Sequence, residues 1–180
     1  MQVISGNMRG LKLNSAKNPD LRPTKDRIKK SLFDILRIQI QGKTFLDLFG
    51  GTGQIGIEAF SQGAKSVTIV ELERENFRII KENIKKIKIP YNIKAYNQEA
   101  VDFLKNSSEK YDIIFLDPPY KNTELLTKSL KEILNSKHLP DILAVEALSS
   151  QQISIDEKKF YLRKKYRYGK ISLYLYEKNN

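Results

Sequence analysis

The chain has 180 residues, of which 40% are hydrophobic and 29% are charged, so it suits one domain with a sizeable core. Lys and Arg number 32 against 21 Asp and Glu, and the resulting net charge of +11 favours a polyanionic partner such as nucleic acid. Without cysteine, and with His138 as the single histidine, the sequence excludes disulfides, thiol nucleophiles, thiolate zinc sites and histidine-based metal clusters.

The first elements form a basic segment ahead of the main domain. Gln2–Ile4 and Met8–Leu13 are strand-like and flank a Ser-Gly-Asn turn, which predicts a hairpin. Residues 14–23 are polar and contain proline, as in a loop. Thr24 is a good N-cap for a helix that runs to about residue 40. We therefore expect residues 1–42 to be a hairpin, loop and helix extension.

From residue 43 to residue 180 the pattern alternates between strands and helices. This alternation predicts an α/β domain with a Rossmann-like, doubly wound, mostly parallel sheet. The chain ends in two strand-like runs around a glycine, which predict an antiparallel hairpin at one edge. We expect strands over 44–49, 66–70, 92–96, 111–116, 142–147, 160–166 and 170–176, and helices over 53–62, 73–87, 99–105 and 122–136.

A glycine-rich turn follows the first of these strands. Gly51, Gly53 and Gly56 match the spacing G-x-G-x-x-G, which lets the backbone approach a ligand closely. Glu71 ends the next strand, where a carboxylate accepts hydrogen bonds from ribose hydroxyls. These features predict a nucleoside cofactor, either NAD or S-adenosylmethionine. The expected cofactor contacts are Asp47, Phe49, Gly50, Gly51, Thr52, Gly53, Gly56, Glu71, Leu72, Glu99 and Ala100.

Asp47 favours S-adenosylmethionine over NAD. Its negative charge, just before the glycines, opposes a pyrophosphate but suits an amino group or a sulfonium. The structural alternative is a hydrogen bond to the loop or the helix start. Glu71 could equally be a solvated strand end, and Glu99 could cap a helix rather than contact adenine.

The tetrapeptide Asp117-Pro118-Pro119-Tyr120 ends the fourth strand of the parallel sheet, which places it beside the glycine turn. The Asp117 carboxylate and the Pro118 carbonyl are suited to accept hydrogen bonds from an exocyclic amino group, and Tyr120 to stack on its ring. Such a site aims the nitrogen lone pair at a methyl carbon and needs no metal. These four residues are the candidate catalytic group. A proline-stiffened turn is the alternative.

Together these motifs resemble the class I S-adenosylmethionine-dependent methyltransferases with a [D/N]-P-P-[Y/F] motif. More narrowly, nearly the whole chain resembles the bacterial 16S rRNA (guanine-N2)-methyltransferase family, the small-subunit rRNA methyltransferase D family. The resemblance implies S-adenosylmethionine as methyl donor and the N2 amino group of one guanine in 16S rRNA, within the assembled small subunit, as acceptor. The matching segments are Arg9–Leu13, Arg22–Arg27, Phe33–Leu36, Asp47–Gly53, Gly56–Ala59 and Leu116–Tyr120.

Basic residues gather at both ends of the chain rather than in the middle. In the last hairpin they alternate with tyrosines, a mixture that suits phosphate contacts and base stacking. For any one lysine, a solvated surface position is the alternative, and a lysine-rich composition by itself raises the pI. The expected RNA contacts are Arg9, Lys12, Arg22, Lys25, Arg27, Lys164, Lys165 and Arg167, and Lys29 belongs to the same N-terminal cluster.

Three other functions share some of these features. A nicotinamide-dependent oxidoreductase would use the glycines and Glu71 but would leave Asp47 and the Asp-Pro-Pro-Tyr segment without a role. A non-catalytic RNA-binding module would keep only the basic surface. An adenine-N6 DNA methyltransferase, or an enzyme that methylates a glutamine amide, would use the same chemistry on another acceptor. No run of about 18 apolar residues and no signal-peptide pattern is found, so we expect a cytoplasmic protein.

Overall fold

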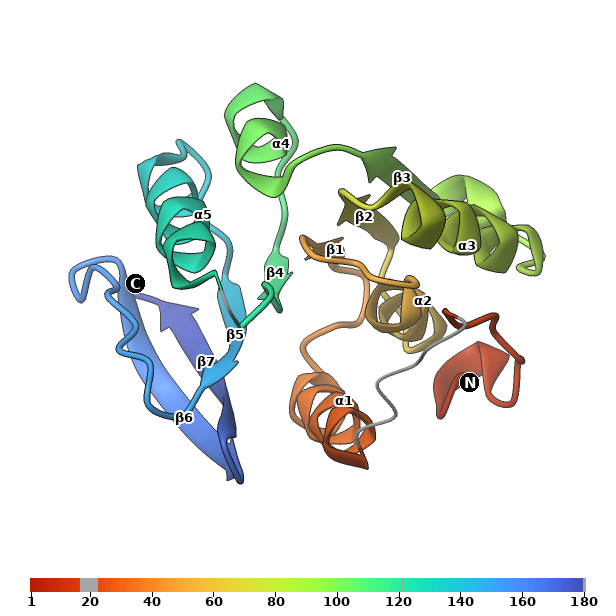
Figure 1. Cartoon of the computed structure of the whole chain (residues 1–180), viewed down its shortest axis with the longest axis horizontal. Coiled ribbons are helices and arrows are strands. Elements are labelled where there is room, and N and C mark those ends of the chain that lie inside the picture. Colours follow the sequence, from red (N-terminus) through yellow and green to blue (C-terminus); the bar gives the residue numbers. More distant parts are fainter. Residues whose placement is uncertain (17–22, 121, 180) are drawn as a thin grey trace.

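The computed structural model of the chain describes residues 1–16, 23–120 and 122–179. One seven-stranded sheet has the order β3-β2-β1-β4-β5-β7-β6, with helices on both faces (Figure 1). The five strands from β3 to β5 are parallel, and β7 and β6 add to this sheet in antiparallel orientation. The strands are β1 (Thr44–Asp47), β2 (Ser66–Glu71), β3 (Ile93–Asn97), β4 (Ile113–Leu116), β5 (Ile142–Leu148), β6 (Phe160–Tyr168) and β7 (Ile171–Lys178).

Two apolar clusters cover the two faces of the sheet. The inner strands are apolar almost throughout because helices bury both of their faces. Side chains from α1, α2 and α3 pack on one face, and side chains from α4 and α5 pack on the other. The expected Rossmann-like α/β fold with an antiparallel C-terminal hairpin is confirmed. The helices are α1 (Pro23–Leu36), α2 (Gln54–Ser61), α3 (Arg74–Lys85), α4 (Ala100–Asn106) and α5 (Thr123–Asn135). No helix within the described ranges has the length and apolarity to cross a bilayer.

The N-terminal segment differs in detail from the predicted hairpin. Gln2 and Lys12 form a single antiparallel bridge, and the turn between them contains a short 3-10 helix over Gly6–Met8. Helix α1 ends at Leu36, and turns fill residues 37–42, so the helix is shorter than its apolar spacing predicts. Val3 is buried in the same cluster as the residues of α1 and α2.

A buried carboxylate fastens this segment to the domain. Glu58 on α2 is fully buried and accepts hydrogen bonds from the backbone N–H groups of Ile4 and Ser5, each at 2.9 Å, and from Gln62 Nε2 at 3.0 Å. Lys29 on α1 is also buried, and its Nζ lies 4.0 Å from Glu58 Oε2. Lys29 therefore does not join the exposed basic cluster to which the sequence assigned it.

The C-terminal hairpin has an exposed outer strand. Only Phe160 of the nine residues of β6 is buried, because β6 is the last strand of the sheet and its faces are largely uncovered. The pairing with β7 shifts by one residue between Leu162 and Lys164, which makes Arg163 the extra residue of a β-bulge.

We predict that Glu58→Ala lowers the free energy of unfolding by about 2–4 kcal/mol, because the N–H groups of Ile4 and Ser5 and the Lys29 ammonium lose their acceptor. Urea unfolding measures this loss. Glu109→Ala, which removes an exposed ion pair with Lys94, is the control and should cost less than about 1 kcal/mol. Equal costs for the two variants would contradict the anchoring role.

Candidate cofactor and catalytic site

The two acids that the sequence singled out lie at the ends of neighbouring strands. Asp47 is the last residue of β1 and pairs in register with Phe115 of β4, and Asp117 follows two residues later. The strand order changes direction between β1 and β4. β2 and β3 lie on one side of β1, whereas β4 and β5 lie on its other side. Such a switch point at the carboxyl edge is where open α/β sheets bind ligands.

Asp47 is a buried carboxylate with one of its oxygens unsatisfied. Its side chain is 1% exposed, and Oδ2 accepts a hydrogen bond from the Gly56 N–H at 2.9 Å. Oδ1 is buried and has no hydrogen-bond partner among the residues that the structure describes. Burial raises the pKa of Asp47 to about 7, and the neighbouring Glu71 adds to the rise. The structural alternative, a bond to the helix start, accounts for only one oxygen, and the other is suited to a cationic ligand.

Glycine is required at different positions of the turn for different structural reasons. Gly51 has a φ of +54°, and a side chain there would meet nothing within 4 Å, so its backbone faces open space. Gly56 lies against Ile69 of β2, where an added Cβ would come within 2.7 Å of the isoleucine side chain. Gly50 lies even closer to Ile69, at 2.2 Å for an added Cβ. Gly51 is therefore the glycine best placed for ligand access, whereas Gly50 and Gly56 allow the turn and α2 to lie on β2.

Glu71 holds the turn from the neighbouring strand. Its Oε2 accepts from the Gly51 N–H and its Oε1 from the Glu73 N–H, each at 2.7 Å. Burial raises the pKa of Glu71, and the two backbone N–H groups oppose the rise. Leu72, the next residue, is 58% exposed. The pair presents a carboxylate and an apolar surface side by side, a combination suited to a ribose and a base.

Glu99 caps helix α4. Its Oε2 accepts a hydrogen bond from the Asp102 N–H at 2.9 Å, and Ala100 begins the helix in a buried position. This is the capping alternative that the sequence left open. Phe49 is partly buried and packs on the cluster beneath α4 and α5.

Asn83 is a buried residue of this site that the sequence analysis missed. From α3, its Nδ2 donates to the carbonyl of Thr52 in the glycine turn at 3.0 Å and to the carbonyl of Asn14 at 3.1 Å. Its Oδ1 accepts from the Asn14 N–H at 2.7 Å. The amide thus joins the N-terminal segment to the glycine turn. A fully polar residue on the apolar face of α3 was the available signal.

The Asp-Pro-Pro-Tyr segment leaves the sheet directly after β4. Pro118 is buried and Pro119 exposed, and Asp117 and Tyr120 are half-buried. The Tyr120 ring packs against the cluster beneath α1, and its hydroxyl donates to Glu146 on β5. The sequence analysis did not identify Glu146 either. The available signal was a charged residue inside an otherwise apolar strand.

Most of the predicted RNA contacts are exposed. Arg9, Lys12 and Arg27 are exposed in the N-terminal part, and Arg22 lies outside the described residues, as does the side chain of Lys25. In the hairpin, Lys164 lies over the Tyr166 ring at 5.3 Å and Lys165 over the Tyr174 ring at 4.7 Å. Arg167 is exposed as well. These contacts hold two cations on opposite faces of β6.

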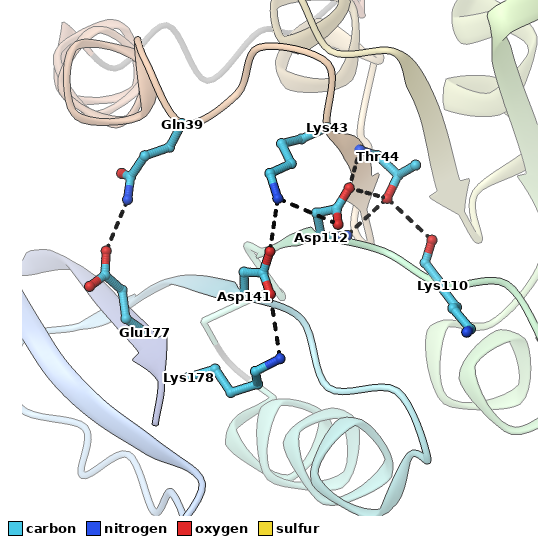
Figure 2. Close-up of polar contacts among 8 residues, drawn as sticks. All are labelled: Gln39, Lys43, Thr44, Lys110, Asp112, Asp141, Glu177 and Lys178. Atoms are coloured by element: carbon cyan, nitrogen blue, oxygen red, sulfur yellow. Dashed lines mark hydrogen bonds and ion pairs between the residues drawn. The ribbon is translucent and has the colours of Figure 1, made fainter. Parts of the chain in front are cut away.

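A cavity lies at the other edge of the sheet, away from both motifs. It has a volume of about 550 Å³ and lies between the amino ends of β4 and β5 and the end of β7. Figure 2 shows that its polar groups pair with one another: Lys43 with Asp141 at 3.0 Å, Lys178 with Asp141 at 3.5 Å, and Gln39 with Glu177 at 3.0 Å. Because these charged groups are paired with one another and largely exposed, we interpret the cavity as a structural contact between the sheet edge and the hairpin rather than as a catalytic site.

Comparison with known proteins identifies relatives over nearly the full length. The family model described as "Conserved hypothetical protein 95" matches residues 1–177. The "Ribosomal RNA small subunit methyltransferase D" of Buchnera aphidicola subsp. Acyrthosiphon pisum is 37% identical over 97% of this chain and 91% of its own length. The protein of the same name from Haemophilus influenzae is 32% identical over 98% and 93%. A solved structure, "Putative methyltransferase yhhF from Escherichia coli", superposes with a TM-score of 0.88 at 29% identity and covers 99% of this chain and 98% of that one.

We predict that Asp47→Asn stabilises the ligand-free protein at pH 8 but has little effect at pH 4. The folded-state pKa of about 7 exceeds the ordinary value of 3.8, so the wild type loses stability as the pH rises through this window, and the amide does not. The gap between the two proteins should widen by about 2–4 kcal/mol. Urea unfolding at both pH values measures it, and a gap that is independent of pH would show that Asp47 is not buried in its charged form.

Proposed function

Since the chain belongs to the conserved hypothetical protein 95 family, we propose that it transfers a methyl group from S-adenosylmethionine to the N2 amino group of a guanine in 16S rRNA. The acceptor lies within the small ribosomal subunit. The observation that carries the proposal is the unsatisfied, buried Oδ1 of Asp47 at the strand-order switch, next to the loop that contains Asp117. The names of the relatives support an rRNA acceptor.

The residues around Asp47 fit a cationic nucleoside cofactor. A ligand ammonium or sulfonium beside Oδ1 would compensate the buried charge and lower the pKa of Asp47. Glu71 would exchange part of its hold on the turn for the ribose hydroxyls, and the exposed Leu72 would contact the adenine. The negative charge of Asp47 would instead repel a pyrophosphate, which argues against a nicotinamide dinucleotide.

The Asp-Pro-Pro-Tyr segment fits the acceptor. An exocyclic amino nitrogen is a weak nucleophile because its lone pair is conjugated with the ring. Hydrogen bonds to the Asp117 carboxylate and the Pro118 carbonyl would draw its hydrogens aside and turn the lone pair toward the donor methyl group. As the N–C bond forms, the C–S bond breaks and sulfur keeps the electron pair. The proton then leaves the nitrogen for Asp117 or for water.

The charged hairpin lies on the same side of the sheet as this segment. Leu116 of β4 pairs with Val145, whereas the last residue of β5, Leu148, pairs with Ile171 at the start of β7. The β6–β7 turn therefore extends about 10 Å beyond the end of β4. In Figure 1 this turn and α1 both lie below the end of β4. Phosphates bound by Lys164, Lys165 and Arg167 would place an RNA strand close to Asp117.

The choice of cofactor is tested by calorimetry. We predict that S-adenosylhomocysteine binds and NADH does not, and that Glu71→Ala weakens the S-adenosylhomocysteine affinity by about 1–3 kcal/mol because a charged acceptor is lost. Glu75→Ala, on the exposed first turn of α3, is the control and should bind as the wild type does. Preferential binding of NADH would favour the oxidoreductase alternative.

The reaction itself is tested by tritiated methyl transfer to small ribosomal subunits from a strain that lacks the modification, followed by nucleoside analysis. We predict N2-methylguanosine as the labelled product. Asp117→Ala should abolish transfer and leave S-adenosylhomocysteine binding intact, because the residue contacts the acceptor and not the donor. Label in adenosine or in protein would refute the proposed acceptor, and turnover by Asp117→Ala would refute the proposed role.

A further inference from the structure

Glu146 is a buried carboxylate in a strand that is otherwise apolar. β5 reads Ile-Leu-Ala-Val-Glu-Ala-Leu, and its first six residues, Glu146 included, are buried. The Glu146 side chain is 4% exposed. Burial of a carboxylate is costly, so a residue of this kind at the carboxyl edge of a sheet marks a position where function overrides packing.

The register places Glu146 next to the loop after β4, which contains the Asp-Pro-Pro-Tyr segment. Val145 pairs with Leu116, and the residues that follow them are Glu146 and Asp117. The bond from the Tyr120 hydroxyl to Glu146 therefore links the loop after β4 to the end of β5. The Tyr120 side chain reaches from the loop after β4 to β5, and its ring packs against the cluster beneath α1.

The backbone of the loop does not by itself fix the orientation of this ring. Pro118 and Pro119 have no backbone N–H to donate to the sheet, and they stiffen the backbone only. The Pro119 carbonyl accepts from the Asn122 N–H at 2.9 Å, which ties the loop to the start of α5 and not to the Tyr120 side chain. The two side-chain torsions of Tyr120 are restrained by ring packing and by the bond to Glu146.

We propose that Glu146 is a positioning residue for methyl transfer, which acts by holding the Tyr120 ring in the orientation on which the acceptor base stacks. The inference rests on the proposed function, because it assumes that a base stacks on Tyr120. Glu146 acts through the tyrosine hydroxyl as a hydrogen-bond acceptor, so its charge is dispensable and its oxygen is not.

A variant series separates this role from a direct contact between Glu146 and the base. Glu146→Gln keeps an acceptor oxygen, Glu146→Leu removes it, and Tyr120→Phe removes the hydroxyl but keeps the ring. The control is Tyr111→Phe. Tyr111 is also half-buried, lies just before β4 at the other end of the strand, and donates to a carboxylate, Glu109, at 3.0 Å.

We expect kcat for transfer to small subunits to fall about tenfold in Glu146→Leu and in Tyr120→Phe, the size of effect that the loss of one hydrogen bond gives. S-adenosylhomocysteine affinity should not change in either. Glu146→Gln should keep kcat within about twofold of the wild type. The double variant that combines Tyr120→Phe with Glu146→Leu should be no slower than either of these single variants, and Tyr111→Phe should match the wild type.

Three results would overturn the inference. If Glu146→Gln is as slow as Glu146→Leu, the charge itself is required, which indicates a direct contact with the base. If the losses of the two single variants multiply in the double variant, the residues act independently. If kcat is unchanged while stability falls, the bond is structural only.

Urea unfolding of the wild type, of Tyr120→Phe, of Glu146→Leu and of their double variant gives a readout that needs no methyl acceptor. The stability losses of Tyr120→Phe and Glu146→Leu should be less than additive in the double variant, because two apolar groups then replace a bonded pair. Additive losses would overturn the inference whatever the substrate is. Wild-type methylation of another amino group would instead refute only the proposed acceptor, and the kcat comparison would then be made on that group.

Discussion

The reversal of strand order between β1 and β4 is the constraint on which the site depends. Because β2 and β3 lie on one side of β1, and β4 and β5 on the other, the loops after β1 and β4 leave the sheet in opposite directions. Asp47 ends one of these strands, and the Asp117 segment follows the other. Residues that lie 70 positions apart in the sequence thus lie at the same edge of the sheet, where the proposed reactants would meet.

Three buried acids show how differently this fold treats a carboxylate. Glu58 is surrounded by donors and an ammonium group, so it stabilises the junction with the N-terminal segment. Glu146 accepts a hydrogen bond from the Tyr120 hydroxyl, in the loop after β4. Asp47 keeps one oxygen without a partner, and burial raises its pKa. The least satisfied acid is the one at the switch point, where a bound cation would supply the missing partner.

Local patterns in the sequence predicted the sheet, the hairpin and the two site loops, because strand runs, glycine spacing and the Asp-Pro-Pro-Tyr segment are each contained in a few adjacent residues. The predicted N-terminal hairpin is reduced to one antiparallel bridge with a few backbone hydrogen bonds on either side of it. The sequence did not predict that Glu58, more than 50 residues away, also holds this segment. Lys29 was assigned to the surface for the same reason, since its buried contact with Glu58 joins residues that lie far apart in the sequence. Asn83 and Glu146 also depend on partners distant in sequence, and for these the only local sign was a polar residue in an apolar pattern.

The outermost strand of the sheet has a second consequence. β6 presents nine residues with one side unpaired, and an uncovered edge of that length normally invites another chain to add a strand and begin aggregation. Its run of cations repels a second copy of itself, and the bulge at Arg163 breaks the regular spacing that a pairing strand would need. The side chains proposed to hold a polyanion thus also oppose edge-to-edge pairing of two copies before any polyanion is bound.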